Sequence, residues 1–206
     1  KTTVFGHVFG SSNYMGSIAV NQSVGTYYIP ELLTYVNITG GNILDYAFYG
    51  CSMLTEIILP EKTQSVNTIG TSAFYGCTGL SEITIPGSIN RINNNAFQNC
   101  NNIEVVNISN LANWITMTFG NMYSSPLNSG AELWVSGQML VDLVVPDSVS
   151  TIGAYVFYGC TSIQTVEIPS SVTSIGAGAF GYNTGIVEIY IPATVTSMGG
   201  SVFVGC

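Results

Sequence analysis

The residues with the greatest capacity for chemistry in this chain are five cysteines, and their spacing limits what that chemistry can be. All five occupy one position of a repeated phrase, three residues after a recurring phenylalanine: Cys51, Cys77, Cys100, Cys160 and Cys206. Their number is odd, no Cys-x-x-Cys pair occurs, and Gly130 and Asn183 fill the same position in other copies. We therefore expect a column of buried free thiols, with no disulfide, metal or cofactor.

Signals of catalysis or nucleotide binding are weak. The segment GAGAFG at 176–181 matches Gly-x-Gly-x-x-Gly, but it coincides with the repeated phrase and opens no long helix. His7 is the single histidine, no acidic residue lies near it in sequence, and no Gly-x-Ser-x-Gly segment occurs. We predict that the protein is not an enzyme.

The charge of the chain limits its partners. Only 7% of the residues are charged, and the formal net charge is −8 with three lysines and arginines in total. So few cations cannot neutralise a phosphate backbone, so we expect no nucleic-acid partner. No apolar run approaches the roughly 20 residues that a membrane-spanning helix needs, so we expect no membrane insertion of this segment.

A recurring phrase must position all of these residues. It consists of an apolar strand ending in Ile-Pro, then Ile-Gly, then Ala-Phe-x-x-Cys, and its phenylalanine, here called the anchor, is Phe48, Phe74, Phe97, Phe157, Phe180 or Phe203. The spacings are 26, 23, 60, 23 and 23 residues, and Leu127 divides the longest into 30 and 30. We therefore predict Leu127 as a seventh anchor, with Leu133 following it as Leu80 follows Phe74.

Repeats of about 20–30 residues with this apolar core are typical of leucine-rich-repeat solenoids, in which each unit buries its apolar side by stacking on its neighbours. The predicted fold class is an α/β leucine-rich-repeat solenoid, mainly parallel β with short 3₁₀ or helical turns, wound as a right-handed coil of about seven units of 23–30 residues. We predict an irregular capping segment at 1–40 and the solenoid at 41–206, with an insertion at about 109–141. The phrase that ends at Cys206 leads us to expect a fragment of a longer protein.

Two segments carry a resemblance to a known family. The phrases AFYGCTGLSEITIPGSINRI (73–92) and YVFYGCTSIQTVEIPSSVTSIGAGAF (155–180) resemble the BspA-like leucine-rich repeats, also called the Treponema pallidum type. The resemblance covers residues 41–206. It implies a secreted or surface-anchored protein, because members are described as adhesins. As partners it implies a host extracellular-matrix or plasma protein, or another cell-surface macromolecule.

Strand alternation predicts one candidate binding face. Ile83 and Ile85 should point into the core, whereas Glu82 and Thr84 should point away from it. The outward positions of the predicted strands hold five carboxylates and a tyrosine: Glu56, Glu82, Asp142, Glu167, Glu188 and Tyr190. This face could dock a basic partner or calcium, or it could be a solvated surface that keeps an open sheet from aggregating.

The predicted insertion is the second candidate. It contains both tryptophans of the chain and a predicted tight turn at 135–138, and its candidate residues are Trp114, Tyr123 and Trp134. These aromatic residues could form an exposed binding patch, because loops that interrupt repeats often carry function. They could equally build a local core.

The function predicted from these observations is that of an extracellular or cell-surface protein-interaction and adhesion module of BspA-like type. The alternative is a set of structural spacer repeats that holds another domain away from the cell. A third hypothesis, a glycan-binding module, rests on the aromatic insertion.

The anchors provide a direct test of the predicted core. Replacing Phe97 by alanine removes a buried ring, so the free energy of unfolding should fall by about 3–5 kcal/mol in urea titrations. The neighbouring substitution Gln98→Ala should change it by less than about 0.5 kcal/mol. Equal effects of the two substitutions would contradict the assignment of the anchor.

Overall fold

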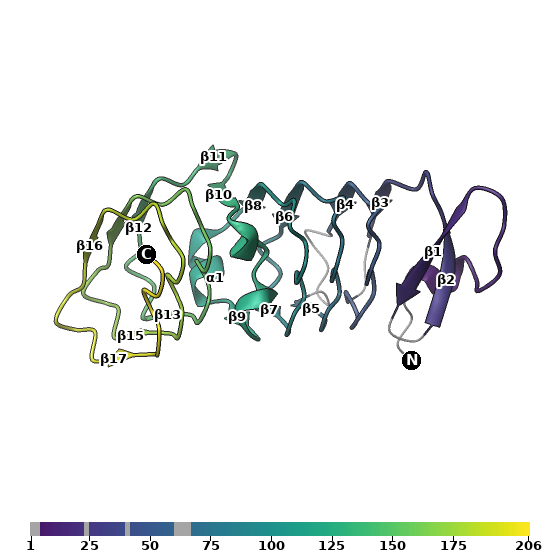
Figure 1. Ribbon diagram of the computed structural model, residues 1–206. Coiled ribbons are helices and arrows are strands. Elements are labelled where there is room, and N and C mark those ends of the chain that lie inside the picture. Colours follow the sequence, from purple (N-terminus) through teal and green to yellow (C-terminus); the bar gives the residue numbers. More distant parts are fainter. Residues whose placement is uncertain (1–4, 23–24, 40–41, 60–66) are drawn as a thin grey trace.

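Successive coils stack along one axis to form a β-solenoid of about seven turns with mostly parallel strands, as predicted (Figure 1). The computed structural model describes residues 5–22, 25–39, 42–59 and 67–206. Most coils contribute one strand to a main sheet face and a short strand to a second face. Figure 1 places these faces along the upper and lower edges of the coils.

The main sheet face contains one strand from each coil, except that two of its strands lie between Leu127 and Phe157. Neighbouring strands are parallel and in register wherever they form a hydrogen-bonded ladder. Its strands are β3 (Tyr35–Asn37), β4 (Glu56–Ile58), β6 (Glu82–Ile85), β8 (Val105–Ile108), β10 (Glu132–Val135), β12 (Asp142–Val144), β14 (Thr165–Glu167) and β16 (Glu188–Tyr190). The ladder is interrupted between β4 and β6 and again before β12. The face therefore consists of three ladders that follow one another along the solenoid.

The second face is built from two-residue strands, which form two ladders, β5-β7-β9 and β13-β15-β17. Their bounds are β5 (Thr68–Ile69), β7 (Arg91–Ile92), β9 (Thr118–Phe119), β13 (Thr151–Ile152), β15 (Ser174–Ile175) and β17 (Ser197–Met198). A buried isoleucine points inward from β5, β7, β13 and β15. These side chains close the core opposite the main face.

The N-terminal segment differs in part from the prediction. It contains a 3₁₀ helix, η1 (Phe5–Val8), and an antiparallel hairpin of β1 (Ser17–Gln22) and β2 (Gly25–Pro30). However, β3 already pairs in parallel with β4. The main sheet therefore begins at Tyr35, inside the range 1–40 that was predicted to be an irregular cap. His7 belongs to η1, and its side chain lies outside the described part of the chain.

The anchors form a stacked column through the core. Phe74 and Phe97 are fully buried with ring centroids 5.1 Å apart, and Phe157 and Phe180 repeat the arrangement at 5.3 Å. Such spacings are typical of attractive aromatic pairs. Leu127 is equally buried, and the Gly130 N–H donates to its carbonyl at 2.9 Å, as the Cys77 N–H does to Phe74. The prediction of Leu127 as an anchor is therefore confirmed.

The cysteine position has a more specific role than its small size suggested. The Cys77 and Cys100 thiols donate to the carbonyls of the preceding anchors, Phe48 and Phe74, at 3.1 and 2.9 Å. The Asn183 amide makes the same bond to Phe157. The position thus favours a small side chain that can donate a hydrogen bond. Four cysteines are buried and free as predicted, but Cys206, in the last coil, is exposed.

The predicted insertion at 109–141 is built into the solenoid. It supplies β9 and β10 together with α1 (Leu111–Thr116), η2 (Met122–Ser124), η3 (Pro126–Ser129) and β11 (Gln138–Met139). The predicted turn at 135–138 is present, since β10 and β11 form a hairpin through Ser136 and Gly137, both with positive φ. Leu133 pairs with Val106 and fills the strand position of Ile83, so its predicted equivalence to Leu80 is wrong.

Helix α1 has six residues, and none of the helices in the described ranges is long and apolar enough to cross a bilayer.

Burial of the cysteines predicts their reactivity. Loss of solvation raises the pKa of the Cys51 and Cys100 thiols from about 9 to about 12. At pH 7.5 a disulfide reagent should therefore react rapidly with Cys206 only and reach the other four thiols only in denaturant, as measured by absorbance. Rapid reaction of several thiols in the native protein would contradict their burial.

The same pKa shifts set a pH dependence. The folded state retains the thiol protons that the unfolded state releases above about pH 9, so this contribution to stability is complete below pH 9. It should decline as the pH rises from about 9 towards 12, and the urea midpoint should fall over that window. A variant with Cys51→Ser and Cys100→Ser should show a smaller fall.

Candidate functional site

The outer side of the main sheet face brings the predicted carboxylates together. Glu56, Glu82, Asp142, Glu167, Glu188 and Tyr190 all lie on strands of this face with exposed side chains, while the residues between them are buried or partly buried. We call the outward residues of these strands the outer face. Its members follow two rows, because the strands are in register.

The C-terminal ladder of the outer face is a small grid. One row reads Asp142, Thr165 and Glu188, and the other reads Val144, Glu167 and Tyr190. These residues line a hollow of about 550 Å³ over the three strands. Val144 and Tyr190 are 59% and 66% exposed on either side of Glu167, so apolar and acidic groups share one surface.

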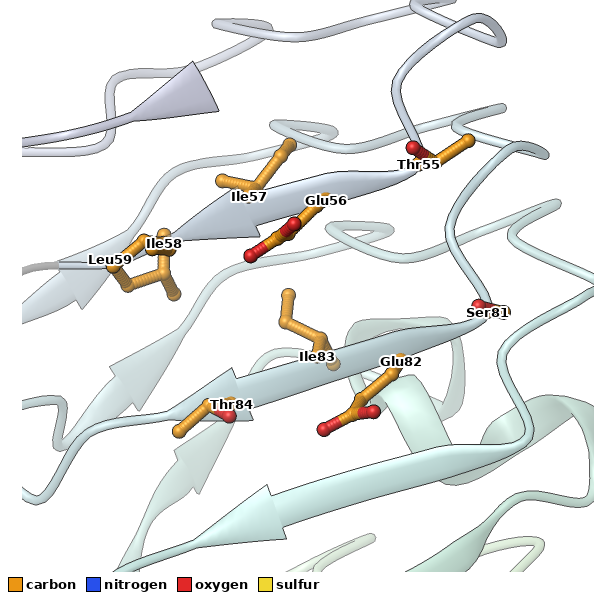
Figure 2. A pocket seen from close by; sticks show the side chains of 9 residues that line it. All are labelled: Thr55, Glu56, Ile57, Ile58, Leu59, Ser81, Glu82, Ile83 and Thr84. Carbon is orange, nitrogen blue, oxygen red and sulfur yellow. The ribbon is translucent and has the colours of Figure 1, made fainter. Parts of the chain in front are cut away.

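The N-terminal part has a second hollow, of about 560 Å³, over β4 and β6, where the ladder is interrupted. Figure 2 shows Glu56 and Glu82 at matching places on these strands, with both side chains leaning the same way. Neighbouring strands lie about 4.8 Å apart in a sheet, so two carboxylates arranged in this way repel each other unless solvent or a partner screens them.

Neutral donors hold most of these carboxylates. Asn107 donates to Glu82 at 2.5 Å, and Thr165 donates to Asp142 at 2.6 Å. Tyr190 donates to Glu188 at 2.8 Å, and the bond and charge of this carboxylate raise the pKa of the tyrosine. Each donor lies on the same strand as its acceptor or on the next one. These bonds orient the carboxylates but leave their negative charge uncompensated.

No cation offsets this charge within the described ranges. Of the three lysines and arginines of the chain, only Arg91 is described, and it lies on β7 of the second face. Glu56 and Glu167 accept no side-chain hydrogen bond from the described residues. The outer face is therefore a line of negative charge beside exposed apolar groups.

Two residues of the outer face were not placed there by the sequence. Glu132 and Trp134 lie on β10, in register with Val105 and Asn107, and the Trp134 indole donates to Glu132 at 3.0 Å. The signal was available, because Glu-Leu-Trp-Val alternates as Glu-Ile-Thr-Ile does at 82–85. Glu132 raises the number of carboxylates on the outer face to six: Glu56, Glu82, Glu132, Asp142, Glu167 and Glu188.

The expected aromatic patch of the insertion does not form. Trp114 is only 1% exposed, so its assignment to an exposed patch is wrong. Trp134 belongs to the outer face, whereas Tyr123 lies in η2 at the turns between strands. The three aromatic residues therefore occupy three different environments.

Trp114 has a structural role that explains its burial. In the regular coils the anchor N–H donates to the carbonyl before the next anchor, as Phe74 does to Ala96 at 2.9 Å. Leu127 instead donates to the Ser125 hydroxyl. The Val156 carbonyl, which would have received that bond, accepts the Trp114 indole N–H at 2.9 Å.

Across the described residues, no three histidine, cysteine or acidic side chains come together as metal ligands would. The carboxylates of the outer face extend in a line along the solenoid, whereas calcium takes about six to eight converging oxygens.

Comparison with known proteins identifies the family of these repeats. The model of the BspA type leucine rich repeat region matches residues 9–129 and 134–206 with six copies. The chain belongs to the BspA-type leucine-rich repeat family. Members of this family are generally protein-interaction modules, and the family and its fold are generally non-enzymatic.

A solved structure agrees with the BspA-type fold, and a second resembles this chain in sequence. A crystal structure of a T. pallidum leucine rich repeat protein is 28% identical, with a TM-score of 0.58, over 96% of this chain and 89% of that one. A leucine rich cell surface protein from Faecalibacterium prausnitzii is 21% identical, with a TM-score of 0.48, over 95% of this chain and 52% of that one. A search of curated proteins found no match.

Trp114 and Trp134 form a matched pair for mutagenesis in this BspA-type chain. Trp114→Phe keeps a ring in the core but leaves the buried Val156 carbonyl without its donor, which should lower the free energy of unfolding by about 1–3 kcal/mol. Trp134→Phe removes an indole N–H at the surface and should change it by less than about 0.5 kcal/mol. Urea titration measures both, and equal losses would refute the role assigned to Trp114.

Proposed function

We propose that this chain is an extracellular or cell-surface interaction module that binds a basic region of a host or cell-surface macromolecule through its outer face. The observation that carries the proposal is the row of six carboxylates with no lysine or arginine beside them in the described structure. Such a surface attracts a positively charged partner over a distance and orients it along the solenoid.

The exposed apolar residues of the outer face could add binding affinity that charge alone does not provide. Val144 and Tyr190 flank Glu167, and Ile58 is 42% exposed two positions after Glu56. Interfaces gain affinity from buried aromatic and aliphatic groups, whereas charge pairs at their rim mainly set the rate of association. A partner with lysine or arginine side chains could lay their methylene stems on these groups and direct the cations to the carboxylates.

The alternative function is that of spacer repeats. The neutral donors that hold Glu82, Asp142 and Glu188 favour it, because such bonds also suit a permanently solvated face. Exposed charge on a sheet discourages aggregation. The two functions differ in whether replacing a carboxylate alters binding.

Surface-plasmon measurements with the whole 206-residue chain distinguish the two functions. The chain is passed over immobilised matrix and plasma proteins and glycans, at low and physiological salt. We expect saturable binding to at least one macromolecule, weakened as salt screens the charges. The double variant Glu82→Gln with Glu167→Gln should bind at least about tenfold more weakly, chiefly through slower association.

Asp147→Asn is the matched control. It removes one negative charge from an exposed loop position after β12, away from the rows, and should bind nearly as the unchanged chain does. If folded protein binds equally well with both carboxylates replaced, the outer face is not the binding surface. If folded protein binds nothing in the panel, the spacer function is favoured.

A further inference from the structure

Tyrosines follow the turns of the solenoid, where the chain passes the anchors. In the N-terminal coils they cover one another, since Tyr49 and Tyr75 stack with centroids 4.6 Å apart and an interplanar angle of 5°. In the C-terminal coils the column opens. Asn128 takes the tyrosine position after Leu127, and Tyr158 and Tyr182 are tilted by 54° with centroids 5.4 Å apart.

A groove of about 480 Å³ lies where the column opens. Its aromatic walls are Tyr123 from η2, Tyr158, and Tyr182, and they come from three successive coils. Burial, followed by the neighbouring tyrosines Tyr182, Tyr123 and Tyr155, raises the pKa of Tyr158. Tyr123 and Tyr182 are 37% and 51% exposed, so the groove is open to solvent.

Glycine shapes the floor of the groove. Gly159 has a φ of +80°, and a Cβ atom there would lie 2.6 Å from the Leu127 carbonyl oxygen and 2.9 Å from the Asn128 Cα. Any larger residue would push the two coils apart. Gly181 lies against the ring of Tyr158, since a Cβ atom at Gly181 would lie 2.9 Å from that ring.

The groove presents neutral hydrogen-bonding groups. None of its lining residues is charged. The three tyrosine hydroxyls, the Asn128 amide and the Thr184 hydroxyl make no side-chain hydrogen bond to any residue in the described ranges. We therefore expect a ligand that is uncharged, offers hydrogen-bond acceptors to these donors, and packs against the tilted rings of Tyr158 and Tyr182.

We propose that this groove binds a proline-rich segment in the polyproline II conformation. Such a segment leaves its carbonyls free, lacks N–H donors at its prolines, and is already ordered before it binds. Aromatic-lined grooves are the usual receptors for it, with proline rings packed between aromatic side chains and tyrosine hydroxyls donating to its carbonyls. The groove is uncharged and lined by tyrosines, whereas the outer face carries carboxylates, so this proposal does not depend on the function proposed above.

The spacing of the coils sets the length of the ligand. Anchor rings of successive C-terminal coils lie 5.3 and 5.6 Å apart, which places Tyr123 and Tyr182, two coils apart, about 11 Å from each other along the solenoid axis. Polyproline II rises by about 3.1 Å per residue. A segment of about four to five residues parallel to the axis therefore reaches from Tyr123 to Tyr182.

The crowding of the rings favours proline over a sugar ring. A sugar stacks on a flat and open aromatic face, but the ring of Tyr158 lies against Gly181 and makes a T-shaped contact with Tyr155 at 71°. Because the centroids of Tyr158 and Tyr182 are only 5.4 Å apart, a ligand packs against the exposed edges of these rings and not between them. A compact pyrrolidine ring suits such edges better than a pyranose does.

The test is an NMR titration of the ¹⁵N-labelled 206-residue chain with acetylated decaproline. We expect saturable shifts of amides in 122–130, 158–161 and 182–184, unchanged between low and physiological salt because the ligand is neutral. A glycine-serine peptide of equal length should produce none of them. Cellohexaose, a neutral oligosaccharide, tests the sugar alternative in the same spectra.

Variants connect the shifts to the groove. Tyr182→Ala should weaken decaproline binding by about tenfold or more. Tyr182→Phe, which keeps the ring and loses the hydroxyl, should weaken it less. Tyr190→Ala, which replaces an exposed tyrosine on the outer face, should leave it unchanged, as should the double carboxylate variant. Thermal unfolding of each variant confirms that it is folded.

The proposal is overturned by any of three results. These are the absence of saturable shifts with decaproline, equal affinity in folded Tyr182→Ala, or shifts in the groove with cellohexaose alone. None of them bears on binding by the outer face, which is measured separately through its salt dependence and its carboxylate variants.

Discussion

Hydrogen bonding between neighbouring coils is the constraint on which this structure depends. A coil cannot satisfy its own backbone groups, so the anchor N–H of one coil must find the carbonyl before the anchor of the next, as Phe180 does with Val202 at 3.0 Å. The fourth coil breaks this pattern, and its own residues repair the break. The Trp114 indole serves Val156 on one side, and the Ile115 carbonyl accepts the Gly153 N–H on the other. An irregular coil is tolerated because a short helix presents the missing partners.

This constraint fixes the inward positions and leaves the outward ones free. A buried anchor, an inward aliphatic residue on the strand and a small residue at the cysteine position recur from coil to coil, whereas strand residues that point to solvent need only avoid disturbing the ladder. The side chains that can contact a partner therefore form rows along the outside of the solenoid. Carboxylates and apolar groups share the main face, tyrosines follow the turns, and each row inherits the regular spacing of the coils beneath it.

The sequence predicted what repeats and missed what departs from the repeat. The repeat period identified the stack of coils, the parallel strands and the unusual anchor Leu127, because each of them follows from residues that recur at a fixed spacing. Leu133 was misplaced because two strand-like segments lie between Leu127 and Phe157, and the one ending in Pro146 matches the strand phrase better than Glu-Leu-Trp-Val does. The alternation at 132–135 would have placed Glu132 and Trp134 correctly. Burial of Trp114 agrees with the local core that the sequence offered as one alternative. Its partner could not be foreseen, since the Val156 carbonyl lies 42 residues away along the chain.

Because its cysteines are free thiols, the fold of the chain does not depend on the redox state of its surroundings. Cys77 and Cys100 donate S–H hydrogen bonds to the preceding coils, and backbone hydrogen bonds link neighbouring coils without any covalent cross-link between them. The chain can therefore reach the same fold in a reducing compartment and in an oxidising one. No disulfide has to form for the coils to stack, because the contacts between them are hydrogen bonds and apolar packing.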